Sequence, residues 1–169
     1  MRIRSYLART HAHTHLRMPT VFPIKYTRVR LIDAVPCKTL FCSTFASEEW
    51  HKWHKTWKHR NTLGCWVARY HGVVIGVSLV SKSNVIKYIA VDPDYQGYKI
   101  GTTLLNLILT DLMDVRSVRL TTASDMRLMT WYGRFGFRIQ ETLYNDDGEF
   151  LGAHMVRYSR PKASRAVIV

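Results

Sequence analysis

The sequence predicts an α/β fold of the mixed, α+β kind, with helices packed on a central and mostly antiparallel sheet. Three observations predict this class. Two strand-like runs near the middle of the chain are joined by a two-residue turn, and two more runs form a hairpin at the end. Between them, a glycine-containing loop leads from a strand into an amphipathic helix and on to another strand, which is a parallel unit. At 169 residues, the chain has the size of one domain.

The first elements are a strand and a helix. Residues 24–31 alternate between apolar and polar side chains, as in a strand with one buried face. Asp33 then suits the N-cap of a helix that reaches about Phe45, and Pro36 is tolerated in the first turn of that helix.

A second helix begins at Ser47 and contains three tryptophans. Spacings of three and four residues put them on one helical face: Trp50, Trp53 and Trp57. We expect this face to pack on the core; the alternative is the wall of a substrate cleft. Histidines and lysines lie between the tryptophans and predict a solvated basic face.

Three strands follow as an antiparallel meander. Residues 65–70 and 73–81 flank the dipeptide His71-Gly72, whose length and composition predict a tight hairpin. Residues 84–91 form a third apolar run, which ends before Pro93.

The second half of the chain alternates helices and strands. Apolar spacing after Gly101 predicts a helix to about Met113, and a further helix runs from Asp125 to Phe135 and stops at Gly136. The remaining strands are expected at 117–122, 137–144 and 151–159.

The chain is strongly basic. It has 25 Lys and Arg against 12 Asp and Glu, a net charge of +13 and a pI near 10.0. This charge favours polyanionic partners: nucleic acid, an anionic membrane or a phosphorylated cofactor. No acidic residue precedes Asp33. We therefore expect a basic N-terminal tail at 1–22, one domain at 23–160 and a short C-terminal tail at 161–169.

The N-terminal tail has more than one interpretation. It is a solvated extension, a targeting presequence or a nucleic-acid-binding arm. Three alternating histidines lack a nearby acid or cysteine to complete a metal site, so we expect no metal: His11, His13 and His15.

The cysteines and the hydropathy exclude other classes. The three cysteines form no CxxC pair, which argues against a disulfide framework or a cysteine zinc site: Cys37, Cys42 and Cys65. No apolar run has the roughly 18–20 residues that a membrane span needs. We expect an intracellular protein without a membrane span, in the cytoplasm or the nucleus.

The stretch from 88 to 105 carries the chemistry. A loop that opens a helix exposes unpaired N–H groups and a partial positive charge, which suit a pyrophosphate. Gly97 and Gly101 allow close backbone approach, and Lys99 adds a charge. The loop has neither the GKS/T ending of a Walker motif nor GxGxxG, so a nucleotide hydrolase and a dehydrogenase are both disfavoured.

The order of elements and two motifs resemble the GNAT superfamily of N-acetyltransferases over residues 24–159. The family's Q/R-x-x-G-x-G/A loop is matched at Gln96 to Gly101, with Lys99 at the position of the first glycine. The family's V-x-P and Y-x-x-x-G-F patterns are matched at Val91, Pro93, Tyr132, Gly136 and Phe137. The resemblance implies a six- to seven-stranded mixed sheet flanked by about four helices.

The resemblance also implies acetyl-CoA as co-substrate, in a V-shaped opening between the strand ending at Val91 and the strand around Leu120. The pantetheine would pair with backbone groups of the first strand, and the diphosphate would lie on N–H groups of the loop. Asp125 stands where many members have an asparagine that touches the pantetheine; the alternative role is an N-cap. The predicted cofactor-binding residues are Ile89, Ala90, Val91, Gln96, Gly97, Tyr98, Lys99, Ile100, Gly101, Thr102, Asp125 and Tyr132.

By the same resemblance, a neutral amine attacks the thioester directly and Tyr132 protonates the departing thiolate. The base that frees the amine is left open among Asp92, Glu149, His154, the Trp/His helix and an ordered water chain. We take Tyr132 and Asp92 as the predicted catalytic pair. Lys87 stands near the place of a glutamate base in some members, and would repel a cationic amine.

The acceptor class remains open at this stage. Small amines such as polyamines, protein lysines and protein N-termini are all compatible with the motifs. The alternative function is a catalytically weak, acetyl-CoA-binding or nucleic-acid-associated regulatory protein. Nucleic acid would be contacted weakly through the basic tail, and the chain would act as a monomer or homodimer.

Overall fold

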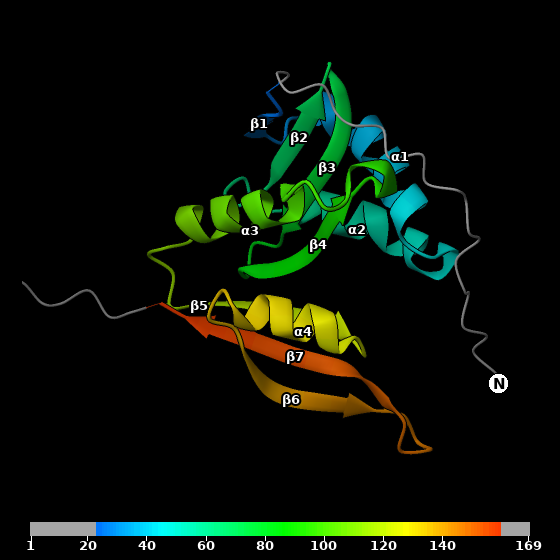
Figure 1. Cartoon of the computed structure of the whole chain (residues 1–169), viewed down its shortest axis with the longest axis vertical. Coiled ribbons are helices and arrows are strands. Elements are labelled where there is room, and N and C mark those ends of the chain that lie inside the picture. The colour runs from blue at the N-terminus through cyan, green and yellow to red at the C-terminus, as the bar shows by residue number, and fades with distance from the viewer. Residues whose placement is uncertain (1–22, 160–169) are drawn as a thin grey trace, which may run out of the picture.

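The computed structural model describes residues 23–159, and it contains one seven-stranded sheet. Only β4 and β5 run parallel; all other neighbouring strands are antiparallel. The predicted mixed, mostly antiparallel sheet is therefore confirmed (Figure 1). In spatial order the strands are β1 (Lys25–Arg28), β2 (Trp66–Tyr70), β3 (Val73–Val80), β4 (Val85–Val91), β5 (Ser117–Ala123), β7 (Phe150–Tyr158) and β6 (Arg138–Tyr144).

Helices cover both faces of the sheet. The ring of Phe41, from the first helix, packs edge-on against Tyr88 of β4 at 4.6 Å, whereas Ile100 and Leu104 of the third helix cluster with Ile89 of β4. Neighbouring strand residues point to opposite faces, so these two helices lie on opposite sides of the sheet. The four described α-helices are α1 (Ala34–Thr44), α2 (Trp53–Lys58), α3 (Ile100–Asp111) and α4 (Met126–Gly133).

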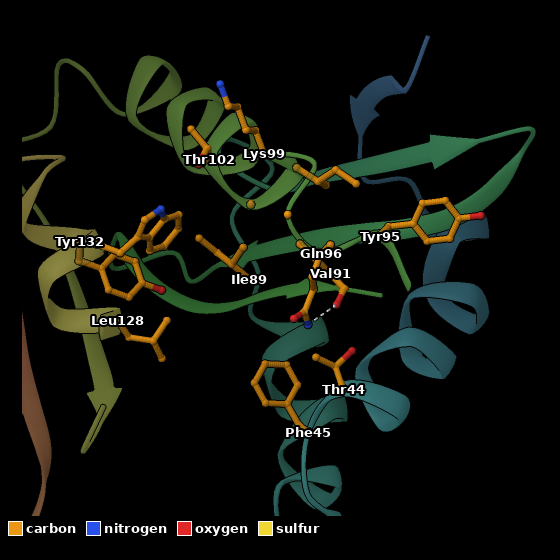
Figure 2. Close-up of a pocket in the computed structure, with 14 residues that line it drawn as sticks. Thr44, Phe45, Ile89, Val91, Tyr95, Gln96, Lys99, Thr102, Leu128 and Tyr132 are labelled. Carbon is orange, nitrogen blue, oxygen red and sulfur yellow. Dashed lines mark hydrogen bonds between the residues drawn. The ribbon is translucent and has the colours of Figure 1, made fainter. Parts of the chain in front are cut away.

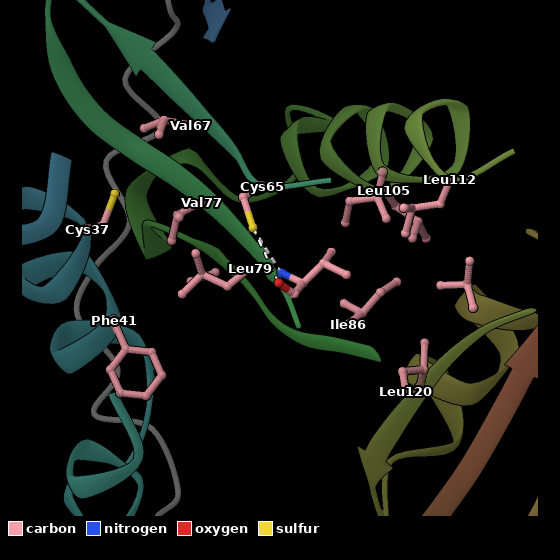
Figure 3. Packing of buried hydrophobic residues seen from close by; sticks show 14 of the residues in the cluster. Cys37, Phe41, Cys65, Val67, Val77, Leu79, Ile86, Leu105, Leu112 and Leu120 are labelled. Atoms are coloured by element: carbon pink, nitrogen blue, oxygen red, sulfur yellow. Dashed lines mark hydrogen bonds between the residues drawn. The ribbon is translucent and has the colours of Figure 1, made fainter. Parts of the chain in front are cut away.

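The core lies between α1, the central strands and α3 (Figure 3). Two of the three cysteines, all of which are free thiols, are fully buried in it. Burial, aided by nearby Asp33, raises the pKa of Cys37 to about 12, and burial raises that of Cys65 to about 11. Both thiols stay protonated at neutral pH and are poor nucleophiles.

Both predicted hairpins are present. His71 and Gly72 have φ values of 49° and 82°, the two positive values that a two-residue type I′ turn requires. The turn between β6 and β7 is closed by the Gly148 N–H, which donates to the carbonyl of Asn145 at 3.0 Å.

Asp33 is the N-cap residue of α1, as the sequence predicted, but its side chain makes no cap hydrogen bond to that helix. Its buried carboxylate accepts the Arg30 N–H at 2.7 Å and pairs with Arg69 of β2. The first strand also ends at Arg28, three residues earlier than predicted, because the chain turns into a short 3₁₀ segment, Leu31–Asp33.

The tryptophan face is only partly as expected. Residues Ser47–Lys52 form a 3₁₀ helix rather than the first turns of an α-helix. The ring of Trp53 is buried and stacks on Trp57, but Trp50 is 44% exposed and donates to the Phe45 carbonyl. The tighter 3₁₀ turn rotates Trp50 away from the shared face.

The far end of α3 is tied to the sheet. Asp111 accepts N–H bonds from the indole of Trp66 at 2.7 Å and from the backbone of Gly64 at 3.0 Å, and it pairs with Arg28. This network holds the C-terminal end of α3 against β1 and β2.

Several expectations concern residues outside 23–159. The two tails and the histidines at 11, 13 and 15 lie outside the described part of the chain. Within residues 23–159, no helix is both long and apolar enough to cross a membrane. The same residues contain no group of three or more His, Cys, Asp or Glu side chains that could hold a metal ion.

Candidate active site

A pocket of about 540 Å³ opens between the end of β4, the start of α3 and the face of α4 (Figure 2). Fourteen residues line it, and nine of them belong to the predicted cofactor set. The lining is Thr44, Phe45, Ile89, Val91, Tyr95, Gln96, Gly97, Lys99, Ile100, Gly101, Thr102, Leu128, Trp131 and Tyr132.

The pocket follows from a fork between the two parallel strands. β4 and β5 pair only at Val85–Arg119 and Ile86–Leu120, whereas β4 stays paired with β3 up to Val91. The Asp92 N–H donates to Ile75 of β3, so by alternation the N–H and C=O groups of Ile89 and Val91 point away from β3. These groups face the fork, where an extended amide-containing ligand can pair with them.

A side chain already uses one of these groups. The Gln96 amide nitrogen donates to the Val91 carbonyl at 3.3 Å, as Figure 2 shows. This bond folds the loop back over the end of β4 and shows that a donor in the pocket can reach the Val91 carbonyl.

The loop before α3 has the backbone geometry of an anion cradle. Gly97 has a φ of 86°, and Lys99, the N-cap residue, has φ 61° and ψ 16°. The first helical bond runs from the Thr103 N–H to the Lys99 carbonyl, so the N–H groups of residues 100–102 precede it and have no acceptor within the helix. They point outward from the positive end of a 12-residue helix.

The left-handed conformation of Lys99 explains the family pattern at this position. Glycine adopts this region without cost, whereas a lysine there is strained by about 1–2 kcal/mol. At this position the backbone has the left-handed conformation that glycine favours, and the Lys99 side chain places a cation beside the cradle.

Gly101 leaves room for a ligand. A Cβ at this position would meet Val91 at 3.8 Å and Trp131 at 4.0 Å, ordinary contacts with two side chains that line the pocket. An added methyl group would thus project into the pocket without disturbing the fold. The space over Gly101 lies beside the outward-pointing N–H groups at the start of α3. Together they fit the diphosphate and pantetheine of acetyl-CoA.

Tyr132 projects its hydroxyl into the interior of the pocket (Figure 2). Its ring packs edge-on against Trp131 at 4.7 Å and Phe137 at 5.7 Å. Burial among these rings raises the pKa of Tyr132 to about 12. The phenol therefore stays protonated at neutral pH, the state that a proton donor needs.

Four predicted residues do not line this pocket. Ala90 is buried, and the exposed ring of Tyr98 lies outside the lining. The Asp92 carboxylate accepts the Asp94 N–H at 3.0 Å and caps a short 3₁₀ helix, Pro93–Tyr95. The Asp125 carboxylate accepts the Arg127 N–H at 2.8 Å and caps α4, and it borders a neighbouring pocket.

Five lining residues were missed from the sequence. Leu128 and Trp131 share a face of α4 with Tyr132, and the spacing of three and four residues was a readable signal. Thr44 and Phe45 reach the pocket from the end of α1, and Tyr95 reaches it from the 3₁₀ segment. Only the tertiary fold brings these last three residues there.

A family model described as an acetyltransferase (GNAT) domain matches residues 31–158. This is well over half of the chain, and the chain therefore belongs to the GNAT acetyltransferases. It is an acetyl-CoA-dependent N-acetyltransferase, and acetyl-CoA is its co-substrate. No match was found among curated protein sequences.

Solved structures share the fold at low identity. The ribosomal-protein-S18-alanine N-acetyltransferase of Escherichia coli is 17% identical, with a TM-score of 0.68 over 84% of this chain and 98% of that one. Naa50 of Arabidopsis thaliana, in complex with the bisubstrate analogue CoA-Ac-MVNAL, is 18% identical, with a TM-score of 0.64 over 79% and 97%. The PaiA N-acetyltransferase of Thermoplasma acidophilum, in complex with coenzyme A, is 13% identical, with a TM-score of 0.60 over 81% and 99%.

Proposed function

We propose that the chain acetylates a primary amine of a polypeptide, with Tyr132 as the proton donor to the departing sulfur. The observation that carries this proposal is the position of the Tyr132 hydroxyl inside the pocket that also contains the end of β4 and the loop before α3. Acetyl-CoA, when bound, supplies the acetyl thioester.

Different residues of the pocket would bind the cofactor and donate the proton. Backbone groups of Ile89 and Val91 would hold the ligand in extended form, and the N–H groups at the start of α3 would hold its diphosphate. The leaving sulfur, a thiol with a pKa of about 8.5 when free, departs more readily if Tyr132 protonates it.

Several of the residues predicted as the base could accept the proton of the amine. Asp92 caps the 3₁₀ segment, and Glu149 accepts a bond from the Asn145 amide at 2.9 Å. His154 lies on β7, and its Nδ1 is 2.8 Å from the Thr121 hydroxyl, next to the last β4–β5 pair. We propose that Asp92 positions the loop and that the amine loses its proton through water on the side of the fork where His154 lies.

A polypeptide acceptor is supported by two of the structural neighbours. One acetylates a ribosomal-protein alanine according to its name, and the other binds an analogue that joins CoA to the peptide MVNAL. Small amines are the second candidate and are included in the test.

The test measures thiol release from acetyl-CoA with peptides bearing a free N-terminus, peptides bearing one lysine, and a polyamine. We expect turnover with peptides, and Tyr132→Phe should lower kcat by about 100-fold. Because burial raises the pKa of Tyr132 to about 12, the donor keeps its proton into the alkaline range. The wild-type rate should therefore not fall up to about pH 10, where an ordinary tyrosine would be half ionised.

The control is Tyr158→Phe, which removes a hydroxyl from an exposed residue at the end of β7 outside the pocket. It should leave kcat unchanged, and Tyr132→Phe should retain the affinity for acetyl-CoA. An unchanged kcat in Tyr132→Phe would refute the donor role, and turnover of the polyamine alone would refute the polypeptide acceptor.

A further inference from the structure

Two neighbouring hollows of about 510 and 570 Å³ lie outside the cofactor pocket, one beside α2 and the other over β5 and β7, and Lys87 of β4 lines both. We call this surface the basic groove. Its lining is His51, Lys52, Lys55, Thr56, His59, Ser81, Lys87 and Tyr88 on the α2 side, and Val85, Arg119, Leu120, Thr121, Gln140, Glu141, His154 and Met155 on the β5–β7 side.

A β-bulge directs Lys87 into the groove. In the register of β3 and β4, Leu79 pairs with Tyr88 and Val80 pairs with Ile86, so Lys87 is the extra residue. A bulge re-aims a side chain, and Lys87 and its neighbour Tyr88 accordingly line the same hollow. This geometry places a cation at the centre of the groove.

Three cations of the groove form no ion pair in the described part of the chain. Lys52 is paired with Glu49 at 2.6 Å, and this bond raises the pKa of Lys52. Glu141, the acidic residue in the lining of the groove, has its carboxylate 4.0 Å from Nε2 of His154. Among the side chains that the structure describes, no ion pair joins an acid to Lys55, Lys87 or Arg119. Their combined field favours a ligand with several negative charges.

The groove adjoins the place where acetyl transfer would occur. Tyr88, which lines the groove, packs edge-on against Phe45, which lines the cofactor pocket, at 5.2 Å. Lys87 and Ile89 are two residues apart on β4, a separation of about 7 Å along a strand. A chain whose amine reaches the fork from this face would therefore pass beside Lys87.

We propose that the basic groove binds an acidic segment next to the amine of the acceptor polypeptide. This inference rests on the proposed function and names the class of acceptor. The same lysines repel a polyamine or a lysine-rich tail. Carboxylates spaced along a peptide match cations contributed by three separate elements, α2, β4 and β5.

A single-stranded nucleic acid fits the groove less well. Such sites combine cations with open aromatic rings on which bases stack. Of the Phe, Tyr and Trp side chains in the described structure, only Tyr88 lines the groove, and its ring is held edge-on against Phe41 and Phe45. A single aromatic ring cannot provide the row of stacking surfaces on which successive bases lie.

The test uses three peptides with the same free N-terminus and either four Glu, four Gln or four Lys among the next residues. Binding is measured by fluorescence anisotropy, and kcat/KM by thiol release at saturating acetyl-CoA. We expect the Glu peptide to bind and react about tenfold better than the Gln peptide at low salt, and the advantage to shrink as salt screens the charges. The Lys peptide should be the poorest.

Substitutions of single lysines test whether the Glu peptide binds in the basic groove. Lys55→Gln and Lys87→Gln should each weaken binding of the Glu peptide about threefold, and the double variant about tenfold. Lys25→Gln is the matched control, since it removes one exposed lysine from β1, an edge strand that does not line the groove. It should leave both measurements unchanged.

The failures of the two proposals can be separated. Equal binding of the Glu and Gln peptides, or equal effects of the groove variants and Lys25→Gln, would overturn the basic groove. Tighter binding of a single-stranded RNA oligonucleotide that displaces the Glu peptide would overturn it too. Binding of the Glu peptide without any acetylation would support the groove and contradict the proposed function.

Discussion

The two halves of the site are built in different ways. The cofactor half comes mainly from one continuous stretch, the end of β4 through the start of α3, with α4 and the end of α1 as its walls. The groups proposed to hold the cofactor there are mostly backbone groups. The acceptor half, the basic groove, is assembled from side chains of α2, β4, β5 and β7. Backbone recognition constrains local sequence, so a short motif reveals it. Side-chain recognition depends on tertiary placement and leaves no such motif.

The largest expected effect is on the cofactor half, at Gly101. Gly101→Val should weaken acetyl-CoA binding roughly 10- to 100-fold, because its side chain would overpack the slot beside Val91 and Trp131. Gly101→Ala should weaken it less. Isothermal titration calorimetry of acetyl-CoA measures both constants.

A matched glycine separates binding from folding. Gly133 lies in α4 and a Cβ there would have nothing within 4 Å. Gly133→Ala should leave the affinity unchanged, and neither alanine variant should lower the thermal midpoint, since alanine favours a helix over glycine. Wild-type affinity in Gly101→Val would refute the cradle.

A smaller effect is expected at Lys99, where charge and backbone strain can be separated. Lys99→Ala removes the charge and keeps a side chain in the left-handed conformation, so acetyl-CoA affinity should fall up to about fivefold. Lys99→Gly removes the charge and the strain together. The thermal midpoint of Lys99→Gly should therefore be higher than that of Lys99→Ala. Titration calorimetry of acetyl-CoA with both variants would show whether the charge or the loop conformation governs the affinity for acetyl-CoA. Equal midpoints would contradict the strain.

The smallest effect is expected from Asp92→Asn. Asparagine also caps a helix, so it can keep the bond to the Asp94 N–H while losing the carboxylate. If Asp92 positions the loop, the pH profile of kcat/KM should be unchanged in this variant, and Asp92→Ala should weaken acetyl-CoA binding a few-fold. A missing acidic limb in Asp92→Asn would instead identify Asp92 as the base.

The sequence predicted the fold correctly, and nine of the residues that it predicted to bind the cofactor line one pocket, for physical reasons. The turn at His71-Gly72 and the loop at 96–101 are set by backbone conformations that few residues adopt, and periodicity identified the strands and helices around them. The ion pair of Asp33 was missed because its partner Arg69 lies 36 residues away. The position of Trp50 was missed because local pattern does not distinguish a 3₁₀ from an α-helical start.

The acceptor half could not be predicted in the same way. Lys87 was noted only as a residue that would repel a cationic amine, and its position in a bulge became visible only in the register of β3 and β4. Arg119 and His154 reach the groove from strands 35 residues apart in sequence. The composition shows the excess positive charge, but it does not show that several of these charges lie beside the fork between β4 and β5.

The most direct test of this division measures two constants in two variants: the Kd for acetyl-CoA and kcat/KM for the Glu peptide at saturating acetyl-CoA, in Gly101→Ala and in Lys87→Gln. We expect Gly101→Ala to raise only the Kd and Lys87→Gln to lower only kcat/KM. If each variant changed both constants to the same extent, the cofactor pocket and the basic groove would not be separate binding sites, and the assignment of the basic groove to the acceptor would be wrong.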